Sequence, residues 1–345
     1  MDNAARWRAV PRLIEIWEAR WDDERGLRGP SAVAVAQGSG MVAVADHVFH
    51  NITFISPRGI VLRHWPRQAR GSGPLSLPAA LDWRPDGTLA VLDPVREKIL
   101  RLDSAGHLVD ESFLAPALVA NFPYRWVSLR GSDVIGTTSP RVVRADTTQM
   151  VTMYLLRTTD SGRVLDTVLT KSVPVVPGRG WSPTFVPGSS VPVAAHLGDG
   201  LLAVAGDVAE FRIRILGPDG QVIRQLCRIT PPTALSEEET AQAPELGTGE
   251  RAPSRARIGR LFWDNESRIW AQRDRVSGVW LQDRWFGPLG ATFDVLDATG
   301  EYLGEVRAPD DTRLAAAHGN TVIGLRADGA GQVTVVGFRL EARER

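Results

Sequence analysis

The chain has 345 residues, of which 43% are hydrophobic, and its 40 basic and 40 acidic side chains give no net charge at pH 7. This composition is ordinary for a soluble globular protein with a large core, and the balanced charge without a long basic stripe argues against nucleic acid as a partner. No apolar run approaches the roughly 20 residues of a membrane helix.

The N-terminus contributes one segment with a strand pattern, Arg12 to Glu18, in which apolar and polar residues alternate. Residues 1–6 lack the apolar stretch of a secretory signal. The protein is therefore either cytoplasmic or exported with a leader that is absent from this sequence, and the compartment stays open.

Six short runs of small and branched apolar residues predict the second strands of six repeated units. They are Met41 to Asp46, Thr88 to Asp93, Asp133 to Thr138, Leu201 to Gly206, Arg268 to Arg273 and Thr321 to Arg326.

Five units also contain a tight turn in which a polar residue and a glycine precede a short apolar strand. An Asp or Ser side chain can bond back to the turn and glycine can take positive φ, so each turn predicts a hairpin. The turn glycines are Gly59, Gly106, Gly162, Gly220 and Gly300. The last unit, Leu314 to Leu340, ends after three strands and lacks an outer strand.

Arg12 to Glu18 is the obvious donor of that missing strand. The sequence therefore predicts one all-β domain over residues 1–345, a six-bladed β-propeller closed by pairing of the N-terminal segment 12–21 with the C-terminal blade. The expected blades are 31–66, 78–114, 124–171, 192–229, 257–307 and 312–340.

Two long connections, 137–150 and 273–291, each join a second strand to a third strand. In a propeller such connections lie on the face where the chain enters the inner strands, so both should rim one mouth of the central channel, where ligands usually bind. The second connection carries Trp280, Trp285 and Phe286. These side chains form either an apolar wall for a ligand or a small core folded over the disc.

Several stretches resemble the six-bladed β-propeller family common in Gemmatimonadota and Bacteroidota, which is related to NHL-repeat and gluconolactonase-like propellers. The stretches extend over nearly the whole chain and are Gly71 to Pro78, Trp83 to Asp93, the Gly106 turn, Cys227 to Pro232, Ser236 to Glu239, and Leu261 to Trp270. The resemblance implies the propeller fold. Family members are often exported or lipid-anchored, which implies a missing leader.

Gluconolactonase-like relatives imply a divalent cation at the channel mouth, held in part by a Glu that enters the first blade. The corresponding run here, Ser31 to Ala36, has no Glu. The alternative ligands are Asp46, His47 and His50, which could share Zn²⁺ or Ca²⁺.

A third imidazole, from His196 or His318, would complete that site. The competing interpretation is that the two histidines are polar surface residues. The carboxylates that end the second strands, Asp46 and Asp93, would then hold backbone N–H groups of their own turns.

Unrepeated polar residues near the expected inner strands are the other candidates for a site. Arginines that converge on the axis would bind a carboxylate or phosphate, whereas the competing interpretation pairs them with Asp264, Asp310 or Asp311. The candidates with a catalytic role are His196, Arg125, Arg257 and Arg313, and those that contact substrate are Tyr124, Trp280, Trp285 and Phe286.

These residues predict a hydrolase of small ester-like substrates (a lactone, aryl ester or phosphoester) at the channel mouth, with or without a divalent metal. The alternative is a propeller that binds a ligand or a partner without catalysis. In both cases the expected ligand is a small, anionic molecule, and the sequence does not indicate the oligomeric state.

Overall fold

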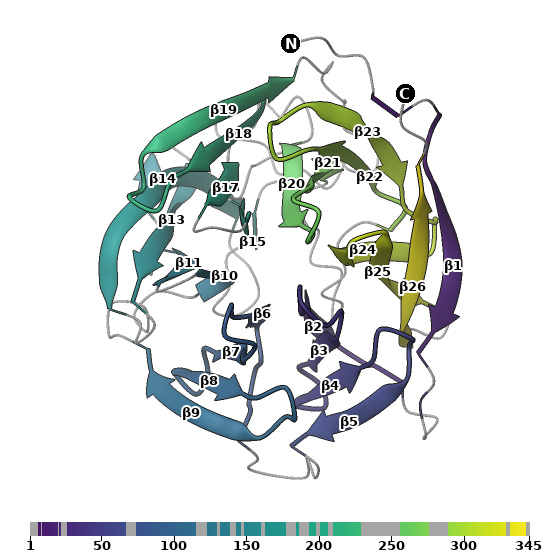
Figure 1. Ribbon diagram of the computed structural model, residues 1–345. Helices are drawn as coiled ribbons and strands as arrows, with labels where there is room; N and C mark the ends of the chain where they lie inside the picture. Colours follow the sequence, from purple (N-terminus) through teal and green to yellow (C-terminus); the bar gives the residue numbers. More distant parts are fainter. Residues whose placement is uncertain are drawn as a thin grey trace.

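Six antiparallel sheets stand around one axis in the computed structural model (Figure 1). The structure describes residues 6–342 without 8, 20, 22–25, 67–73, 115–122, 130–131, 139–142, 146–147, 160–162, 177–183, 186–192, 198–200, 206–209, 229–255, 276–288 and 329–331. Within 123–148, and at 173–176, 184–185, 196, 256–257 and 274–275, the description is of the backbone alone. The described part contains no helix long and apolar enough to cross a membrane.

Five sheets have four strands and run from the axis to the rim. Four of them are meanders, and the fifth takes its outer strand from the N-terminal part of the chain. Their strands are β2 (Pro30–Val35), β3 (Val42–Asp46), β4 (Asn51–Ile55) and β5 (Val61–Trp65); β6 (Ala80–Trp83), β7 (Leu89–Asp93), β8 (Lys98–Leu102) and β9 (Leu108–Phe113); β16 (Val193–His196), β17 (Leu202–Ala205), β18 (Phe211–Leu216) and β19 (Val222–Arg228); β20 (Ala256–Trp263), β21 (Ile269–Arg275), β22 (Thr292–Leu296) and β23 (Tyr302–Arg307); and β24 (Thr312–His318), β25 (Thr321–Ala327), β26 (Val333–Glu341) and β1 (Arg12–Glu18).

The remaining sheet is larger than a four-stranded blade. Its strands are β10 (Pro123–Leu129), β11 (Ser132–Thr138), β12 (Val143–Ala145), β13 (Thr148–Thr158), β14 (Val164–Val176) and β15 (Thr184–Phe185).

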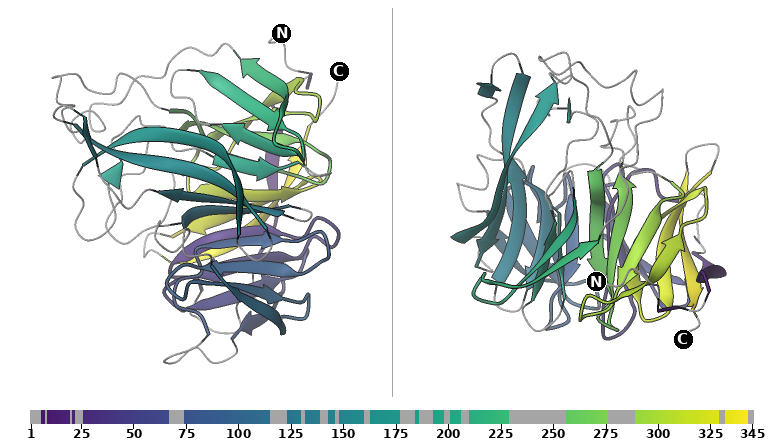
Figure 2. Two further views of the ribbon diagram at one scale, coloured as in Figure 1. Left: turned by 90° about the vertical axis from the view of Figure 1, so that its left-hand side faces the viewer. Right: turned by 90° about the horizontal axis from the view of Figure 1, so that it is seen from above.

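The expected loop 137–150 is in part a continuation of this sheet. Pairing of β13 with β14 runs on to Gln149 and Val175, past the last pair with β11 at Met153, while β12 and β15 flank the extension. The extension projects from one face of the disc (Figure 2). The all-β propeller is thus confirmed with five regular blades, but the third unit is not the simple four-stranded blade that the sequence predicts.

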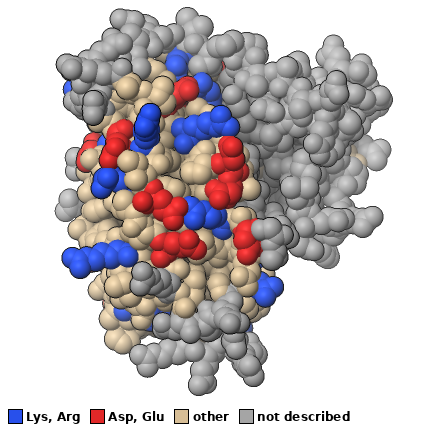
Figure 3. Space-filling view, turned by 90° about the vertical axis from the view of Figure 1, so that its right-hand side faces the viewer, with Lys and Arg blue, Asp and Glu red and all other residues tan. Residues whose placement is uncertain are grey.

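The N-terminal strand β1 pairs antiparallel with β26, with Leu13 opposite Leu340. Trp17 of β1 lies against Gly337 of β26 and against the turn at Gly59 of the neighbouring sheet. Arg326 of β25 adds ion pairs to Glu15 and Glu18 on β1. Acidic and basic side chains alternate over this side of the molecule, which suits an edge strand that must not pair further (Figure 3).

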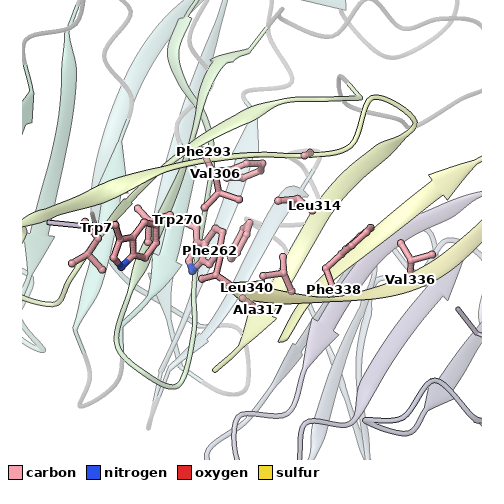
Figure 4. Packing of buried hydrophobic residues seen from close by; sticks show 14 residues of the cluster. Trp7, Phe262, Trp270, Phe293, Val306, Leu314, Ala317, Val336, Phe338 and Leu340 are labelled. Carbon is pink, nitrogen blue, oxygen red and sulfur yellow. The ribbon is translucent and has the colours of Figure 1, made fainter. Parts of the chain in front are cut away.

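Upstream of β1, the chain also covers the edge of the next sheet. The N–H groups of Arg6 and Trp7 donate to the carbonyls of Tyr302 and Leu303 on β23. Trp7 is only 4% exposed and packs among Trp270, Phe262 and their neighbours between two sheets (Figure 4). A Cβ at Gly304 would come within 2.6 Å of the Trp7 ring, so the ring occupies space that only glycine leaves.

The second strands have the burial that a central strand requires, because neighbouring sheets cover both of their faces. Every residue of β3 and of β7 is buried. The outer strands differ: β9 and β19 are largely exposed. Cys227 lies on β19 and is exposed.

The glycine turns are hairpins, as predicted. In the described turns at 59, 106, 220 and 300 the glycine has φ between 75° and 84°. Its N–H group donates to the backbone carbonyl of the residue three positions earlier. Each turn also meets the preceding sheet: Arg63 donates to the carbonyl of Ser104, and Arg224 Nη1 donates to that of Thr299 over 2.7 Å. The turns therefore fix the spacing of neighbouring sheets.

Gly300→Ala should destabilise the protein more than Gly87→Ala. Both residues have nearly the same positive φ, 84° and 81°, so both substitutions incur a similar backbone strain of about 1 kcal/mol. A Cβ at Gly300 would in addition overlap Leu226, whereas nothing lies within 4 Å at Gly87. We expect an extra loss of about 1–3 kcal/mol at Gly300, measured by urea unfolding. Equal losses would show that the contact with Leu226 is easily relieved.

Candidate functional site

Buried carboxylates hold the segments that lead into the inner strands. Asp46, at the end of β3, accepts N–H groups of Arg28 and Gly29 in the lead-in segment at 2.7 and 3.1 Å. It also accepts those of Val48 and Phe49 in its own turn at 2.9 and 3.0 Å. The end of a second strand and the start of an inner strand therefore lie on one face, which we call the lead-in face.

The next sheet repeats this arrangement. Asp93 accepts the N–H groups of Ser76 and Leu77 in its lead-in segment and that of Arg96 in its turn. The structural interpretation of these two aspartates is thus confirmed. Four N–H groups already bind the two oxygens of Asp46, and its role as a metal ligand stays a prediction.

The two predicted histidine ligands hold different lead-in segments. His47 Nδ1 lies 2.6 Å from the carbonyl of Gly29, and His50 Nδ1 lies 2.5 Å from that of Ser76. His50 has a φ of 51°, uncommon for a residue with a side chain. Among the described residues, no three His, Cys, Asp or Glu side chains are grouped to hold a metal ion. The described residues do not fit the divalent cation that the resemblance implied.

Four inner strands carry a β-bulge, at the second residue of β2 and β10 and at the fourth residue of β20 and β24. On β2, Pro30 is opposite Asp46 and Ala32 opposite Ala45, so Ser31 is the extra residue. The corresponding extra residues of β10, β20 and β24 are Tyr124, Gly259 and Ala315. Bulges redirect side chains and are common at the rims of barrels and next to active sites.

Arginines stand at the start of three of these strands. Arg125 follows the bulge residue of β10, and Arg257 and Arg313 are the second residues of β20 and β24. The backbone therefore brings three of the predicted site residues, together with Tyr124, to the lead-in face. A fourth arginine, Arg260, donates to the carbonyls of Leu314 and Ala315 at 3.0 and 2.7 Å, which ties β20 to β24.

The acids that the sequence offered as partners for these arginines pair elsewhere. Asp264 binds Arg268 at 2.7 Å, Asp310 binds Arg307 at 2.9 Å, and Asp311 binds Arg326 at 3.3 Å. Pairing of the inner-strand arginines with these acids, the competing interpretation, stays a prediction.

The predicted histidine partners lie toward the other face. His196 is the last residue of β16, opposite Leu202 across the hairpin, and His318 is the last residue of β24. At about 3.3 Å per residue, the start and end of β16 are roughly 10 Å apart. His318 Nε2 lies 2.9 Å from the carbonyl of Gln37 in another hairpin. The proposed set of His196 with His47 and His50 is thus divided between two faces.

The aromatic residues of the second long connection lie outside the described residues. Trp280, Trp285 and Phe286 fall within 276–288, so their role as substrate contacts stays a prediction.

A charged cluster between two sheets was missed by the sequence analysis. The fully buried Asp294 of β22 binds Arg228 of β19 and Arg273 of β21, the latter through Nε at 2.9 Å. Glu305 also binds Arg273, at 2.9 Å, and the Arg228 guanidinium stacks on Tyr302 at 3.7 Å. No short motif reveals this cluster, since its members come from separate strands.

The surroundings raise the pKa of two groups in this cluster, Arg273 and Tyr302. Burial disfavours the charge on Arg273, but Asp294 and Glu305 outweigh it and keep the pKa of Arg273 above its ordinary value. Burial, with the charge of Asp294, raises the pKa of Tyr302. Arg273 therefore stays charged, and Tyr302 neutral, across the physiological range. This role is structural, because the groups satisfy one another.

Comparisons with known proteins identify the fold. No family model and no curated protein matches this sequence. Among solved structures, a member of the duf4221 family from Bacteroides vulgatus has a TM-score of 0.56 at 8% identity, covering 97% of this chain and 99% of that one. A putative exported protein from Bacteroides fragilis has a TM-score of 0.55 at 8% identity, covering 97% and 96%.

A gluconolactonase from Xanthomonas campestris is less similar, with a TM-score of 0.45 at 15% identity and coverage of 98% and 91%. The similarity to the two Bacteroides proteins bears on the fold and not on activity. With the arrangement of the sheets, it shows that this chain is a β-propeller.

Proposed function

We propose that the lead-in face binds a small anionic molecule at the axis. The observation that carries this proposal is the placement of Arg125, Arg257 and Arg313 at the starts of three inner strands. A guanidinium group donates two parallel hydrogen bonds to a carboxylate or phosphate, and its charge persists at every physiological pH. Three such groups from separate strands of a rigid fold would supply charge and orientation together.

The engagement of nearby acids supports this assignment. Asp310 and Asp311 directly precede β24 but bind Arg307 and Arg326. Positive charge at the axis would then be a local feature, since the chain as a whole has no net charge.

Hydrolysis of small ester-like molecules remains a prediction for the same face. Arginines that bind an anion could also stabilise the charge that develops on an ester oxygen during hydrolysis. The described histidines of this face, His47 and His50, bind backbone carbonyls through Nδ1. Binding without catalysis is the function that the geometry supports best.

Arg125→Ala and Arg257→Ala should each weaken the binding of benzoate or phenyl phosphate at least tenfold, because each removes a charged hydrogen-bond donor worth about 1.5–3 kcal/mol. Isothermal titration would measure this effect. Arg58→Ala is the matched control, since Arg58 is an exposed arginine in a hairpin turn on the opposite face and should leave affinity unchanged. Equal effects of all three substitutions would contradict the proposed site.

The same proteins should be assayed with lactones, aryl esters and phosphotriesters, with and without a chelator. Turnover that Arg125→Ala or Arg257→Ala abolishes would establish the hydrolase. Turnover that a chelator abolishes, and that is also lost on substitution of His47 or His50, would restore the metal hypothesis. Binding without turnover would leave a ligand-binding propeller.

We further propose that the larger sheet is the sixth blade of one closed ring. The inner strands support this arrangement, since they contact one another in the order β2, β6, β10, β16, β20, β24 and β24 again contacts β2. Pairing of β1 with β26 would then join the two ends of the chain in the last blade.

A further inference from the structure

The fourth strands β5, β9, β14, β19 and β23 share a β-bulge at their second residue, and the side chain there is aliphatic in all five. On β23, Leu296 is opposite Tyr302 and Val295 opposite Gly304, so Leu303 is the extra residue. On β9, Leu102 is opposite Leu108 and Arg101 opposite Asp110, so Val109 is the extra residue. The two strands therefore present the same backbone geometry at their outer edges.

One of these edges is occupied by the protein itself. The carbonyls of Tyr302 and Leu303 accept the N–H groups of Arg6 and Trp7. Consecutive carbonyls of a regular strand point in opposite directions, so it is the bulge that offers two acceptors to one added segment. Arg6 also lies 3.6 Å from Asp297 and 3.5 Å from Glu301 in the adjoining turn. Leu303 is 4% exposed as a result of this covering.

The equivalent edge of β9 is bare among the described residues. β9 is the last strand of its sheet, Val109 is 57% exposed and Phe113 is 69% exposed. An unpaired strand edge that carries large exposed apolar side chains is the usual template for addition of another strand.

Acidic side chains predominate at this edge, beside Lys98, whose Nζ lies 5.0 Å from the Phe113 ring centroid, and His107, whose Nδ1 lies 3.1 Å from Asp103. Asp103 occupies in its turn the position that Asp297 has beside Arg6, as each accepts the N–H group four residues later. Asp110 is exposed and occupies on β9 the position that Gly304, which leaves room for Trp7, has on β23. The next residue, Glu111, forms an ion pair with Lys98 over 2.9 Å. An added segment would thus meet a carboxylate at Asp110 where Trp7 meets a glycine, which selects a basic residue over an aromatic one.

We propose that the outer edge of β9 binds an extended basic segment of a partner protein by addition of a strand to the sheet. The two carbonyls at the Leu108–Val109 bulge accept its N–H groups, Asp103 and Asp110 pair with its basic residues, and its apolar side chains cover Val109 and Phe113. This surface lies at the rim, separate from the proposed anion site at the axis.

The test is fluorescence anisotropy with a labelled peptide of alternating valine and arginine, titrated with the full chain. We expect saturable binding that weakens at least tenfold in Asp110→Lys. Ile223→Lys is the matched control, because Ile223 is the exposed bulge residue of β19, beside the basic Arg224, and should not affect binding. Both positions are exposed, and melting curves will verify that both variants fold.

Two peptide variants separate strand addition from simple charge attraction. N-methylation of alternate peptide amides should abolish binding, since it removes the N–H donors and keeps every charge. A peptide with glutamate in place of arginine should not bind. Retained binding of the methylated peptide, or equal weakening by Asp110→Lys and Ile223→Lys, would overturn the proposal. So would self-association of the chain that Asp110→Lys removes, since the occupant would then be a second copy.

Discussion

A chain that lacks residues 1–21 should melt at least about 10 °C below the full chain. The deletion removes β1 from β26 and Trp7 from the edge of β23. Loss of a buried Trp side chain alone costs about 3–5 kcal/mol, and the loss of a paired strand adds to it. At about 2.1 cal/mol/K of unfolding entropy per residue, a total loss of about 7 kcal/mol corresponds to this shift for a chain of 345 residues.

Calorimetry or circular dichroism would measure the melt. A deletion of residues 1–5 is the matched control, because it shortens the N-terminus but keeps Arg6, Trp7 and β1. It should melt like the full chain. If the longer deletion also melts like the full chain, β1 and Trp7 do not stabilise the fold and the proposal of a ring closed by β1 is wrong.

Asp294→Ala should lower the free energy of unfolding by about 3–5 kcal/mol, because it leaves two guanidinium groups without their buried counter-charge. Asp294 is fully buried and binds Arg228 and Arg273 from two neighbouring sheets. Urea unfolding would measure the loss. Asp294→Asn is the informative control. It keeps the side-chain volume and one acceptor oxygen, and it removes the negative charge.

A compensated variant separates the charge from the packing. Replacing Arg228 and Arg273 by methionine in the Asp294→Ala background should recover part of the stability, because a buried ionic cluster can be exchanged for apolar contacts at little cost. A loss below about 1 kcal/mol in Asp294→Ala would contradict the burial and pairing of this carboxylate, since an unpaired buried charge costs more.

The features that the sequence predicted correctly depend on local chemistry. The turn glycines adopt positive φ because a tight hairpin requires it, and the short apolar runs are second strands because both faces of those strands are covered. Arg12–Glu18 was found from its alternation and from the missing strand of the last unit. Each of these inferences uses residues close together in the chain.

The features that were missed depend on contacts between distant residues. Arg228 and Asp294 are 66 positions apart, and nothing in either segment indicates the other. The bulge at Tyr124 depends on how β10 pairs with β11, and the pattern of apolar residues does not reveal that pairing. His196 was placed near the mouth because it belongs to an inner strand, but its position along that strand puts it at the hairpin end.

The pattern His47-x-x-His50 illustrates the limit of a short motif. Its spacing allows two imidazoles to share a metal, but each Nδ1 binds the carbonyl of a different lead-in segment. Asp46 likewise looked like a ligand because it ends a strand beside them. Its four backbone N–H partners, two of them 17 and 18 residues earlier in the chain, show that it organises the face.

A crystal structure of the protein with bound phenyl phosphate would test the central claim most directly. The proposed function predicts the phosphate at the lead-in face of the axis, within hydrogen-bonding distance of guanidinium groups at the starts of β10 and β20. A phosphate bound at the hairpin face beside His196 and His318, or one that contacts neither Arg125 nor Arg257, would contradict it.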